Sequence, residues 1–333
     1  MDNREMDNMV AEKPVARWQP VRAEGENGLF SQSWFPVALS AEVAKGQVIG
    51  RDFLDGRIVI FRGDDGVARV MSAYCPHVGA DLSVGEVVGD RIQCAFHHWE
   101  YDVTGKCVKT GSGDPAPKRA CLFVFPSAER FGIIWAFNGE KPLFDLPQLP
   151  YPDSELLMST YKADEPLNCD PWVFAANTPD MQHLKVVHKV KFEVEDPHDL
   201  VKWHDFGLEY SYAGIHQGGV PMKNTAGILG TSVFYRWGQY GNFWRAGVVG
   251  FGLPRPGQHE VYACQAVLRG PDAEANHAET IRVSRRTVLE DKDILNTIRY
   301  RQGIMTPADK TLSRFLKYVR EYPCAHPSAD FIR

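Results

Sequence analysis

The chain has 333 residues, of which 44% are hydrophobic and 24% are charged, and its formal net charge is −5. A chain of this length exceeds what one hydrophobic core usually holds, so we expect two domains in an ordinary soluble globular protein. The acidic balance implies no basic surface and excludes nucleic acid as an expected partner. Seven cysteines are too few for a disulfide scaffold, and we expect thiols in a reducing compartment.

Residues 1–28 are polar and mixed in charge, which predicts a loose leader. The segment lacks the apolar core of a signal peptide, and no apolar run in the chain approaches the length of a membrane span. The sequence therefore predicts a cytoplasmic protein with no membrane partner.

The first domain is expected over 29–145, where β-branched or aromatic runs alternate with turns rich in Gly and Asp. The sequence predicts strands at 57–62, 121–125 and 132–137, and the domain is expected to be all-β. A proline cluster follows, which interrupts regular structure and marks a domain boundary; it consists of Pro142, Pro147, Pro150 and Pro152.

Two short pairs of metal-binding residue types lie within this domain. Cys75 and His77 form a Cys-x-His pair, Cys94 and His97 form a Cys-x-x-His pair, and residues 78–93 separate the pairs. Two thiolates and two imidazoles on paired loops can bind zinc or an iron–sulfur cluster. A zinc finger normally pairs like ligands, whereas a Rieske [2Fe–2S] centre places two Cys on one iron and two His on the other. The mixed pairs therefore favour the Rieske centre.

The stretch from about 34 to 138 resembles the Rieske family closely, down to the neighbours of the four expected ligands: Pro76, Gly79, Leu82 and Trp99. Two positions depart from the family's pattern, because Ala95 stands where a Pro is usual and His98 stands where a Gly is usual. His98 is thus a rival imidazole beside His97. We favour His97 because its two-residue spacer fits the family.

The second domain, expected over 146–333, has mixed structure. Thr178 followed by Pro179 predicts a helix start, with Thr as the N-cap and Pro in the first helical position. Residues 200–270 predict strands, interrupted by a long Gly-studded loop at 214–230. Helices are predicted at about 286–302 and 308–321. The fold class is therefore α+β, an all-β domain followed by an antiparallel sheet with helices.

The helix predicted after Pro179 carries His183 and His188, five residues apart. On a regular helix five residues turn by about 140°, so the two imidazoles can bind one metal only if the helix bends or widens. Spacing alone leaves open that they are two unrelated surface or core histidines.

The same segment resembles the Asn-x-x-Asp-x-x-His-x-x-x-x-His pattern that follows the Rieske domain in the Rieske non-haem iron oxygenases; here it consists of Asn177, Asp180, His183 and His188. In that family the two His and a later carboxylate bind a mononuclear iron, and such a triad leaves positions open for O2. Residues 289–295 resemble the family's Glu-Asp pattern opening a C-terminal helix. The resemblance implies Asp291 as the carboxylate, with Asp293 as the alternative, and both could instead be solvated helix residues.

The resemblance also gives Asp180 a catalytic role that is not ligation. The matching Asp bridges an imidazole of the cluster in one subunit to an iron-binding His in the next. The plainer interpretation is a charge that stabilises a helix N-terminus, and both can hold.

Together these resemblances imply the terminal oxygenase α-subunit of a multicomponent system, assembled as a head-to-tail homotrimer. Its cofactors would be a [2Fe–2S] Rieske cluster and a mononuclear Fe(II). Electrons from NAD(P)H would arrive through a separate reductase, with or without a ferredoxin, because the chain has no Gly-x-Gly-x-x-Gly dinucleotide fingerprint. The expected reaction is monooxygenation by hydroxylation or by N- or O-dealkylation. A Rieske electron carrier without catalysis is the alternative, and the second domain argues against it.

The substrate is expected to be small, largely apolar and aromatic. Most aromatic residues between 201 and 251 should build a sheet core, and a minority should line a cavity near the iron. No basic residue of this stretch announces a carboxylate-binding clamp, although four lie there: Lys202, Lys223, Arg236 and Arg245. The loop predicted at 214–230 could gate entry.

Overall fold

The computed structural model describes residues 20–299 and 303–333, so the first 19 residues of the predicted leader lie outside the described residues. The described part of the leader is tied to the body of the protein. Glu24 is buried, and its carboxylate accepts hydrogen bonds from the backbone N–H and the hydroxyl of Ser31.

The first half of the chain is built from short antiparallel strands. They are β1 (Phe30–Ser31), β2 (Trp34–Leu39), β3 (Val48–Phe53), β4 (Gly56–Arg62), β5 (Ala68–Ser72), β6 (Glu86–Val88), β7 (Arg91–Gln93), β8 (Glu100–Tyr101), β9 (Cys107–Lys109), β10 (Ser127–Arg130) and β11 (Ile133–Phe137). Three sheets result, with strand orders β3-β4-β5, β10-β11-β2 and β6-β7-β8-β9. The all-β character predicted for this half is confirmed.

Two of the three strands predicted here are confirmed, as β4 and β11. The strand predicted at 121–125 is wrong, because Cys121 forms an isolated bridge with Lys106 whereas Val124 forms one with Met71. The segment therefore crosses from the β9 side to β5, and its apolar residues fill the core between sheets without following one strand.

The second half is one large antiparallel sheet with helices on it. Its strands are β12 (Leu156–Lys162), β13 (Lys191–Phe192), β14 (Lys202–His204), β15 (Gly207–His216), β16 (Val220–Leu229), β17 (Val233–Tyr240), β18 (Phe243–Arg255) and β19 (Gln258–Leu268), and β20 (Cys324–Ala325) follows near the C-terminus. The helices are α1 (Pro171–Ala175), α2 (Met181–Val186), α3 (Ala273–Leu295), α4 (Lys310–Glu321) and α5 (Ala329–Ile332). The sheet has eight strands in the order β12-β19-β18-β17-β16-β15-β13, with β14 paired to β15. The predicted α+β fold is confirmed.

The long loop predicted at 214–230 is wrong, because β15 and β16 form a hairpin through this stretch. Gly218 and Gly219, each with φ 83°, make its turn. Gly227 lies within the strand, where a Cβ would come 2.4 Å from the ring of Tyr235. The glycines that suggested a loop therefore serve one tight turn and close packing.

The helix predicted at 308–321 is confirmed as α4, whereas the one predicted at 286–302 is α3, which begins at Ala273 and ends at Leu295. Residues 300–302 lie outside the described residues. The early start was missed because the buried positions of the first turns of α3 are small or polar, including His277 and Thr280. A search for large apolar residues at helical spacing does not detect such a stripe.

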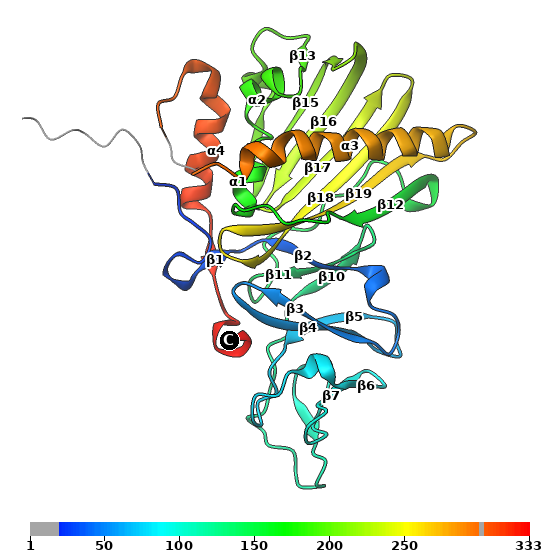
Figure 1. Cartoon of the computed structure of the whole chain (residues 1–333), viewed down its shortest axis with the longest axis vertical. Helices are drawn as coiled ribbons and strands as arrows, with labels where there is room; N and C mark the ends of the chain where they lie inside the picture. The colour runs from blue at the N-terminus through cyan, green and yellow to red at the C-terminus, as the bar shows by residue number, and fades with distance from the viewer. Residues whose placement is uncertain (1–19, 300–302) are drawn as a thin grey trace, which may run out of the picture.

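The two faces of the large sheet have different neighbours. Along β17, Val233 and Tyr235 point to one face and pack with Trp135 of β11, whereas Phe234 and Arg236 point to the other, as strand alternation requires. Figure 1 shows α3 lying across the large sheet, with the sheets of the first half below it. Trp34, Ile133 and Trp135 of the first half pack with the face that carries Val233 and Tyr235, opposite to α3. A cavity between α3 and the sheet is therefore shielded from the first half by the sheet itself.

The end of the chain returns to the first half. Strand β20 pairs with β1, and Ile332 of α5 is fully buried in the core that contains Phe53 and Leu54. None of the seven cysteines forms a disulfide. Over the described ranges, no helix is both long enough and apolar enough to cross a membrane.

Candidate metal centres

The loops that carry the two Cys/His pairs make the same backbone turn. The N–H of Gly79 donates to the carbonyl of Cys75 at 2.8 Å, and the N–H of His98 donates to the carbonyl of Cys94 at 2.9 Å. Gly79 has φ 81° and His98 has φ 52°, in the left-handed region that favours glycine. His98 therefore occupies the turn position of its loop, which explains why a Gly is usual there.

The four predicted cluster ligands lie with sulfur inward and nitrogen outward. Cys75 and Cys94 are 2% and 1% exposed, whereas His77 and His97 are exposed. The two imidazole rings lie next to each other edge to face, with centroids 4.6 Å apart and an angle of 70° between their planes. Two buried thiols and two adjacent exposed imidazoles fit the asymmetry of a Rieske cluster, which has one thiolate-bound and one imidazole-bound iron.

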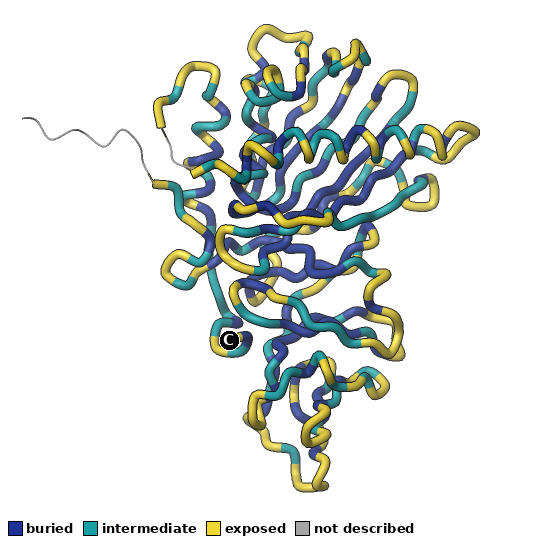
Figure 2. Tube along the Cα trace, viewed as in Figure 1, coloured by how far each residue is buried: buried dark blue, intermediate teal, exposed yellow. Residues whose placement is uncertain are grey.

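Other side chains fix this arrangement. His77 stacks on Trp99 with ring centroids 4.3 Å apart, and the hydroxyl of Tyr101 lies 3.0 Å from Sγ of Cys75. Burial raises the pKa of the Cys75 thiol, and the neighbouring Cys94 raises it further. A thiol in this position ionises readily only when a cation such as iron replaces its proton. In Figure 2 the end of the molecule that carries β6 and β7 in Figure 1 is largely exposed.

His183, His188 and Asp291 converge at the other end of the molecule. The Nε2 atoms of the two histidines lie 2.9 Å apart, and Oδ1 of Asp291 lies 3.3 Å from each. Two ligand atoms at right angles and about 2.1 Å from one ion are separated by about 3.0 Å. The three atoms therefore fit one face of a six-coordinate ion, as in a 2-His-1-carboxylate site.

The carboxylate of Asp291 supports this fit independently. The residue is 2% exposed, and its Oδ1 has no hydrogen-bond donor. A buried carboxylate oxygen without a partner is costly, and a bound cation removes that cost. Asp293, the alternative from the sequence, is exposed on α3.

The local fold explains how two histidines five residues apart meet. Helix α2 ends at Val186, so His188 lies beyond the helix. Lys189 has φ 57°, and the N–H of Val190 donates to the carbonyl of Leu184, which turns the chain back. The separation of about 140° expected on a regular helix therefore does not arise.

The predicted helix start is wrong by two residues. Helix α2 begins at Met181, and its N-cap is Asp180, whose Oδ1 accepts a hydrogen bond from the N–H of His183 at 2.9 Å. An Asp side chain that accepts from the third helical N–H is a strong N-cap, so it determines the boundary in place of Thr178. This contact is the helix-terminal role considered for Asp180.

Asp291 comes from the last turns of α3, near its C-terminus, so the sequence interpretation of a helix opening there is wrong. Asn177 donates from Nδ2 to Oδ2 of Asp291 at 3.3 Å, and Glu290 Oε2 lies 3.1 Å from Nδ1 of His188. The sequence reasoning quoted both residues within its motifs without giving them a role. Burial lowers the pKa of His183, which favours the neutral imidazole that binds metals.

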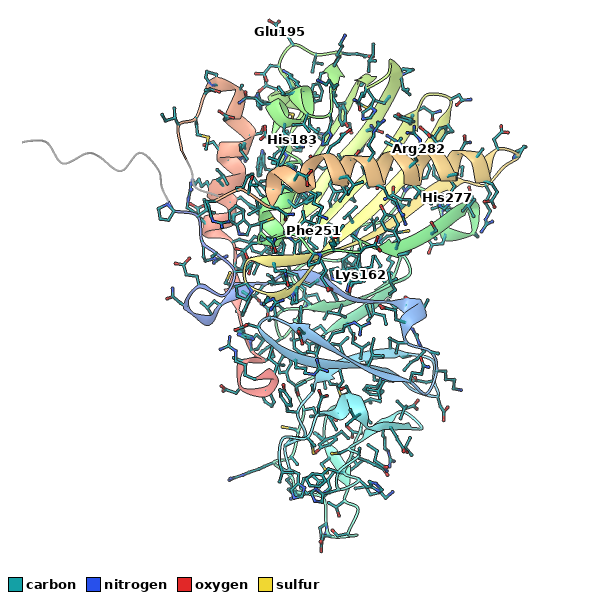
Figure 3. All side chains as sticks on the ribbon, viewed as in Figure 1. Lys162, His183, Glu195, Phe251, His277 and Arg282 are labelled. Atoms are coloured by element: carbon teal, nitrogen blue, oxygen red, sulfur yellow. The ribbon has the colours of Figure 1, made fainter. Side chains whose placement is uncertain are left out.

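A cavity of about 150 Å³ extends from these three residues between α3 and the sheet. Tyr210, Tyr212 and Phe234 line its sheet side, which confirms that a minority of the aromatic residues face a cavity beside the predicted iron ligands. Figure 3 shows His183 beside the C-terminal part of α3. The strands also place Arg236 and Arg245 in the cavity lining, and both arginines were named from the sequence without being given a role.

Comparison with known proteins agrees with this architecture. Residues 33–126 match the family model of the Rieske [2Fe-2S] domain. The chain is 34% identical over 165 residues to cholesterol 7-desaturase nvd of Bombyx mori, a match that covers 48% of this chain and 36% of that protein. It is 32% identical over 163 residues to the oxygenase component of chloroacetanilide N-alkylformylase of Rhizorhabdus wittichii, covering 48% of this chain and 47% of that protein. The matches thus span less than half the length of these relatives.

Solved structures extend the similarity to both halves. Dicamba monooxygenase bound to dicamba superposes with a TM-score of 0.67 at 20% identity, over 87% of this chain and 96% of that chain. NdmA of Pseudomonas putida CBB5 with caffeine has a TM-score of 0.67 at 19% identity, over 86% of this chain and 89% of that chain. The chain therefore contains a Rieske [2Fe–2S] domain and has the two-domain fold of the Rieske non-haem iron oxygenases, the family that its motifs indicate.

Proposed function

We propose that this protein is the terminal oxygenase component of a multicomponent Rieske system and catalyses O2-dependent monooxygenation of a small aromatic compound. The observation that carries the proposal is the convergence of His183, His188 and Asp291 at one end of a cavity lined by aromatic side chains. A Rieske electron carrier needs no such site. The second half of the chain therefore favours catalysis over electron transport alone.

The first centre is assigned as a [2Fe–2S] cluster held by Cys75, His77, Cys94 and His97. Its support is the arrangement of buried thiols and adjacent imidazoles within the matched Rieske domain. Imidazole ligands raise the reduction potential above that of an all-Cys cluster. The exposed histidines would receive electrons that a reductase, with or without a ferredoxin, draws from NAD(P)H.

The second centre is assigned as a mononuclear Fe(II) site. When bound, Fe(II) on a 2-His-1-carboxylate triad supplies open positions at which O2 can react. The protein's own residues orient the metal ligands and enclose the cavity. Asn177 holds the carboxylate of Asp291, Glu290 orients the ring of His188, and Tyr210 and Phe234 exclude water from the cavity.

Monooxygenation is preferred over dioxygenation because of the relatives. They include the oxygenase component of dicamba O-demethylase of Stenotrophomonas maltophilia, 29% identical over 166 residues, which are 49% of each chain. The similar proteins also include the oxygenase component of chloroacetanilide N-alkylformylase and NdmA, whose structure was solved with caffeine. The reaction proposed here is hydroxylation, or removal of an N- or O-alkyl group through an unstable hydroxylated carbon, in a reducing cytoplasm.

A head-to-tail homotrimer is part of the proposal. In Figure 1, β6 and β7 of the cluster-bearing end and α2 of the iron-bearing end lie at opposite ends of the long axis. The two centres of one chain are thus widely separated, and a head-to-tail arrangement would bring the cluster of one subunit to the iron site of the next. Asp180, at the start of α2, would then bridge His97 of one chain to His183 of its neighbour.

The test is O2 uptake by the purified protein with a reductase and NADH, screened over small aromatic and N-alkyl compounds, with product mass. We expect a red-brown protein with a Rieske-type EPR signal on reduction, and substrate-dependent O2 uptake. Cys94→Ala should lose the signal, and the matched change His98→Ala should keep it. A colourless zinc protein contradicts the cluster, and an intact cluster without O2 uptake for any compound favours the electron carrier.

A further inference from the structure

Two arginines stand side by side on the sheet wall of the cavity. In the β17–β18 ladder, Arg236 pairs with Gly247 and Arg245 pairs with Gly238, so the two arginines are diagonal neighbours on one face. Each faces a glycine across the ladder, which leaves room for two long side chains. At Gly247 even a Cβ would come within 2.9 Å of Oε1 of Gln265.

Arg245 is buried, and two of its three guanidinium nitrogens have no hydrogen-bond partner. The residue is 3% exposed, and the two nitrogens are Nε and Nη1. Its guanidinium lies over the ring of Tyr240, 3.5 Å from the centroid. This cation–π contact holds the side chain in place, but the ring does not accept the N–H groups that lie in the plane of the guanidinium. Because an arginine stays charged in proteins, burying it without a counter-charge is strongly unfavourable.

No carboxylate compensates either charge. Within residues 20–299 and 303–333, no Asp or Glu lies within ion-pair distance of Arg236 or Arg245, and Asp291 is the one acidic residue of the cavity lining. Glu279 acts on Arg245 only at a distance, and its own carboxylate binds Arg282 through two hydrogen bonds. Figure 3 shows Arg282 on α3. Two adjacent like charges in an apolar cavity therefore lack a carboxylate partner from the described part of the chain.

We propose that the cavity binds a small organic acid, with the carboxylate held by Arg236 and Arg245 and the apolar body directed toward Asp291 and the two histidines. Carboxylates are the anions that planar guanidinium groups bind through two parallel hydrogen bonds. That the other end of this acid reacts at the metal site rests on the proposed function, whereas recognition of its carboxylate by the arginines does not. In the sequence alone, neither arginine announced such a clamp.

The dimensions of the cavity limit the size of the acid. Val283 belongs to the buried cluster that contains Tyr240, and Asp291 lies eight residues further along α3, which is about 12 Å along the helix axis. The cavity volume of about 150 Å³ is close to that of an engineered protein cavity that accepts benzene. A single-ring acid therefore fits between the arginines and the metal ligands.

The test measures binding without turnover. The holoprotein, kept free of O2 and reductase, is titrated calorimetrically with 4-methylbenzoate and with the neutral, similarly shaped 4-methylbenzamide. We expect the acid to bind at least tenfold more tightly than the amide. Arg236→Gln and Arg245→Gln should each weaken binding of the acid about tenfold or more and leave the amide unchanged. Arg255→Gln, at an exposed arginine on β18, is the matched control and should change neither.

Equal affinity of the wild type for acid and amide, or an unchanged preference in Arg236→Gln, would overturn the inference. If Arg245→Gln fails to fold because Tyr240 loses its partner, Arg236→Gln decides alone. Binding of the acid through the arginines in a protein that never consumes O2 supports the inference and defeats the proposed oxygenase. Turnover of neutral compounds with no preference for the acid defeats the inference and leaves the oxygenase.

Discussion

The two candidate metal centres are assembled from the chain in different ways. The four cluster ligands come from two neighbouring loops, and each loop closes on the same hydrogen bond from the fifth residue to its Cys. His183 and His188 are also close in sequence, but Asp291 arrives from α3, which has to lie across the large sheet before the site exists. Local spacing therefore defines the first centre, whereas the second depends on the complete fold of its domain.

The largest expected effect is the loss of the mononuclear iron site while the cluster is retained. Asp291→Ala should remove the mononuclear iron and all oxygenase activity while the Rieske EPR signal remains, because the cluster ligands lie in the other domain. Asp293→Ala, two residues away on the exposed side of α3, is the matched control and should keep both metals. Iron content per chain and O2 uptake are the measurements. Loss of activity in the Asp293 variant instead would show that the carboxylate was misassigned.

Sequence spacing was sufficient where the geometry is local. The Cys-x-His and Cys-x-x-His pairs predicted which side chains meet, and the structure brings His77 and His97 together. The role of His98 could not be read from the sequence, because its positive φ is a property of the folded turn. The turn that the two loops share is recognisable only when the folded loops are compared with each other.

The second site was predictable from motifs but not from helical geometry. A regular helix was the wrong assumption for His183 and His188, because the helix ends between them. The arginines of the cavity were named in the sequence and given no role. The two arginines are close because the register of the β17–β18 pairing makes Arg236 and Arg245 diagonal neighbours. No periodic pattern in the sequence predicts that register.

The next prediction asks whether the two centres are coupled through Asp180. Its carboxylate caps α2 in one chain, and the bridge to a neighbouring subunit stays a prediction. Asp180→Asn keeps the shape but removes the charge, and its amide NH2 can face only one of two N–H donors without repulsion. We expect both metals, the trimeric mass and reduction by the reductase to be retained, while reoxidation of the cluster with substrate and O2 slows by about 100-fold. Reoxidation at the wild-type rate would leave Asp180 as a helix cap alone.

The contact between Glu24, in the described part of the leader, and Asp170, in the second half of the chain, gives a pH-dependent prediction. The N–H of Glu24 donates to Asp170 at the start of α1, and burial raises the pKa of Glu24 from 4.5 to about 7. A carboxyl whose pKa is raised by folding stabilises the fold while protonated, so stability is lost as pH rises from about 4.5 to about 7. The loss corresponds to about 3 kcal/mol. Glu24→Gln should match the wild type in thermal unfolding at pH 4.5 and exceed it at pH 8. An equal melting temperature at pH 8 would contradict the raised pKa.

A smaller effect is expected at the residue that orients the iron carboxylate. Asn177→Ala removes the amide that donates to Oδ2 of Asp291 and should weaken metal binding about tenfold, as typical for such supporting contacts. The measurement is Fe(II) loss to a chelator, followed by iron content. Asn276→Ala, at a half-buried position in the first turn of α3, is a control that should leave retention unchanged. Unchanged retention in the Asn177 variant would show that the fold alone fixes the carboxylate.

The smallest expected effect tests whether the two cluster loops are equivalent. His98 holds φ 52°, the position that Gly79 fills in the other loop, and left-handed backbone costs a non-glycine residue about 1–2 kcal/mol. Histidine tolerates this region better than most residues, and glycine loses more entropy on folding, so the net gain from His98→Gly should be about 0.5 kcal/mol. His98→Ala keeps the backbone cost and should not stabilise. The measurement is thermal loss of the cluster's visible absorption. If His98→Gly is purified without a cluster, His98 is a ligand in place of His97, and the equivalence of the two loops fails.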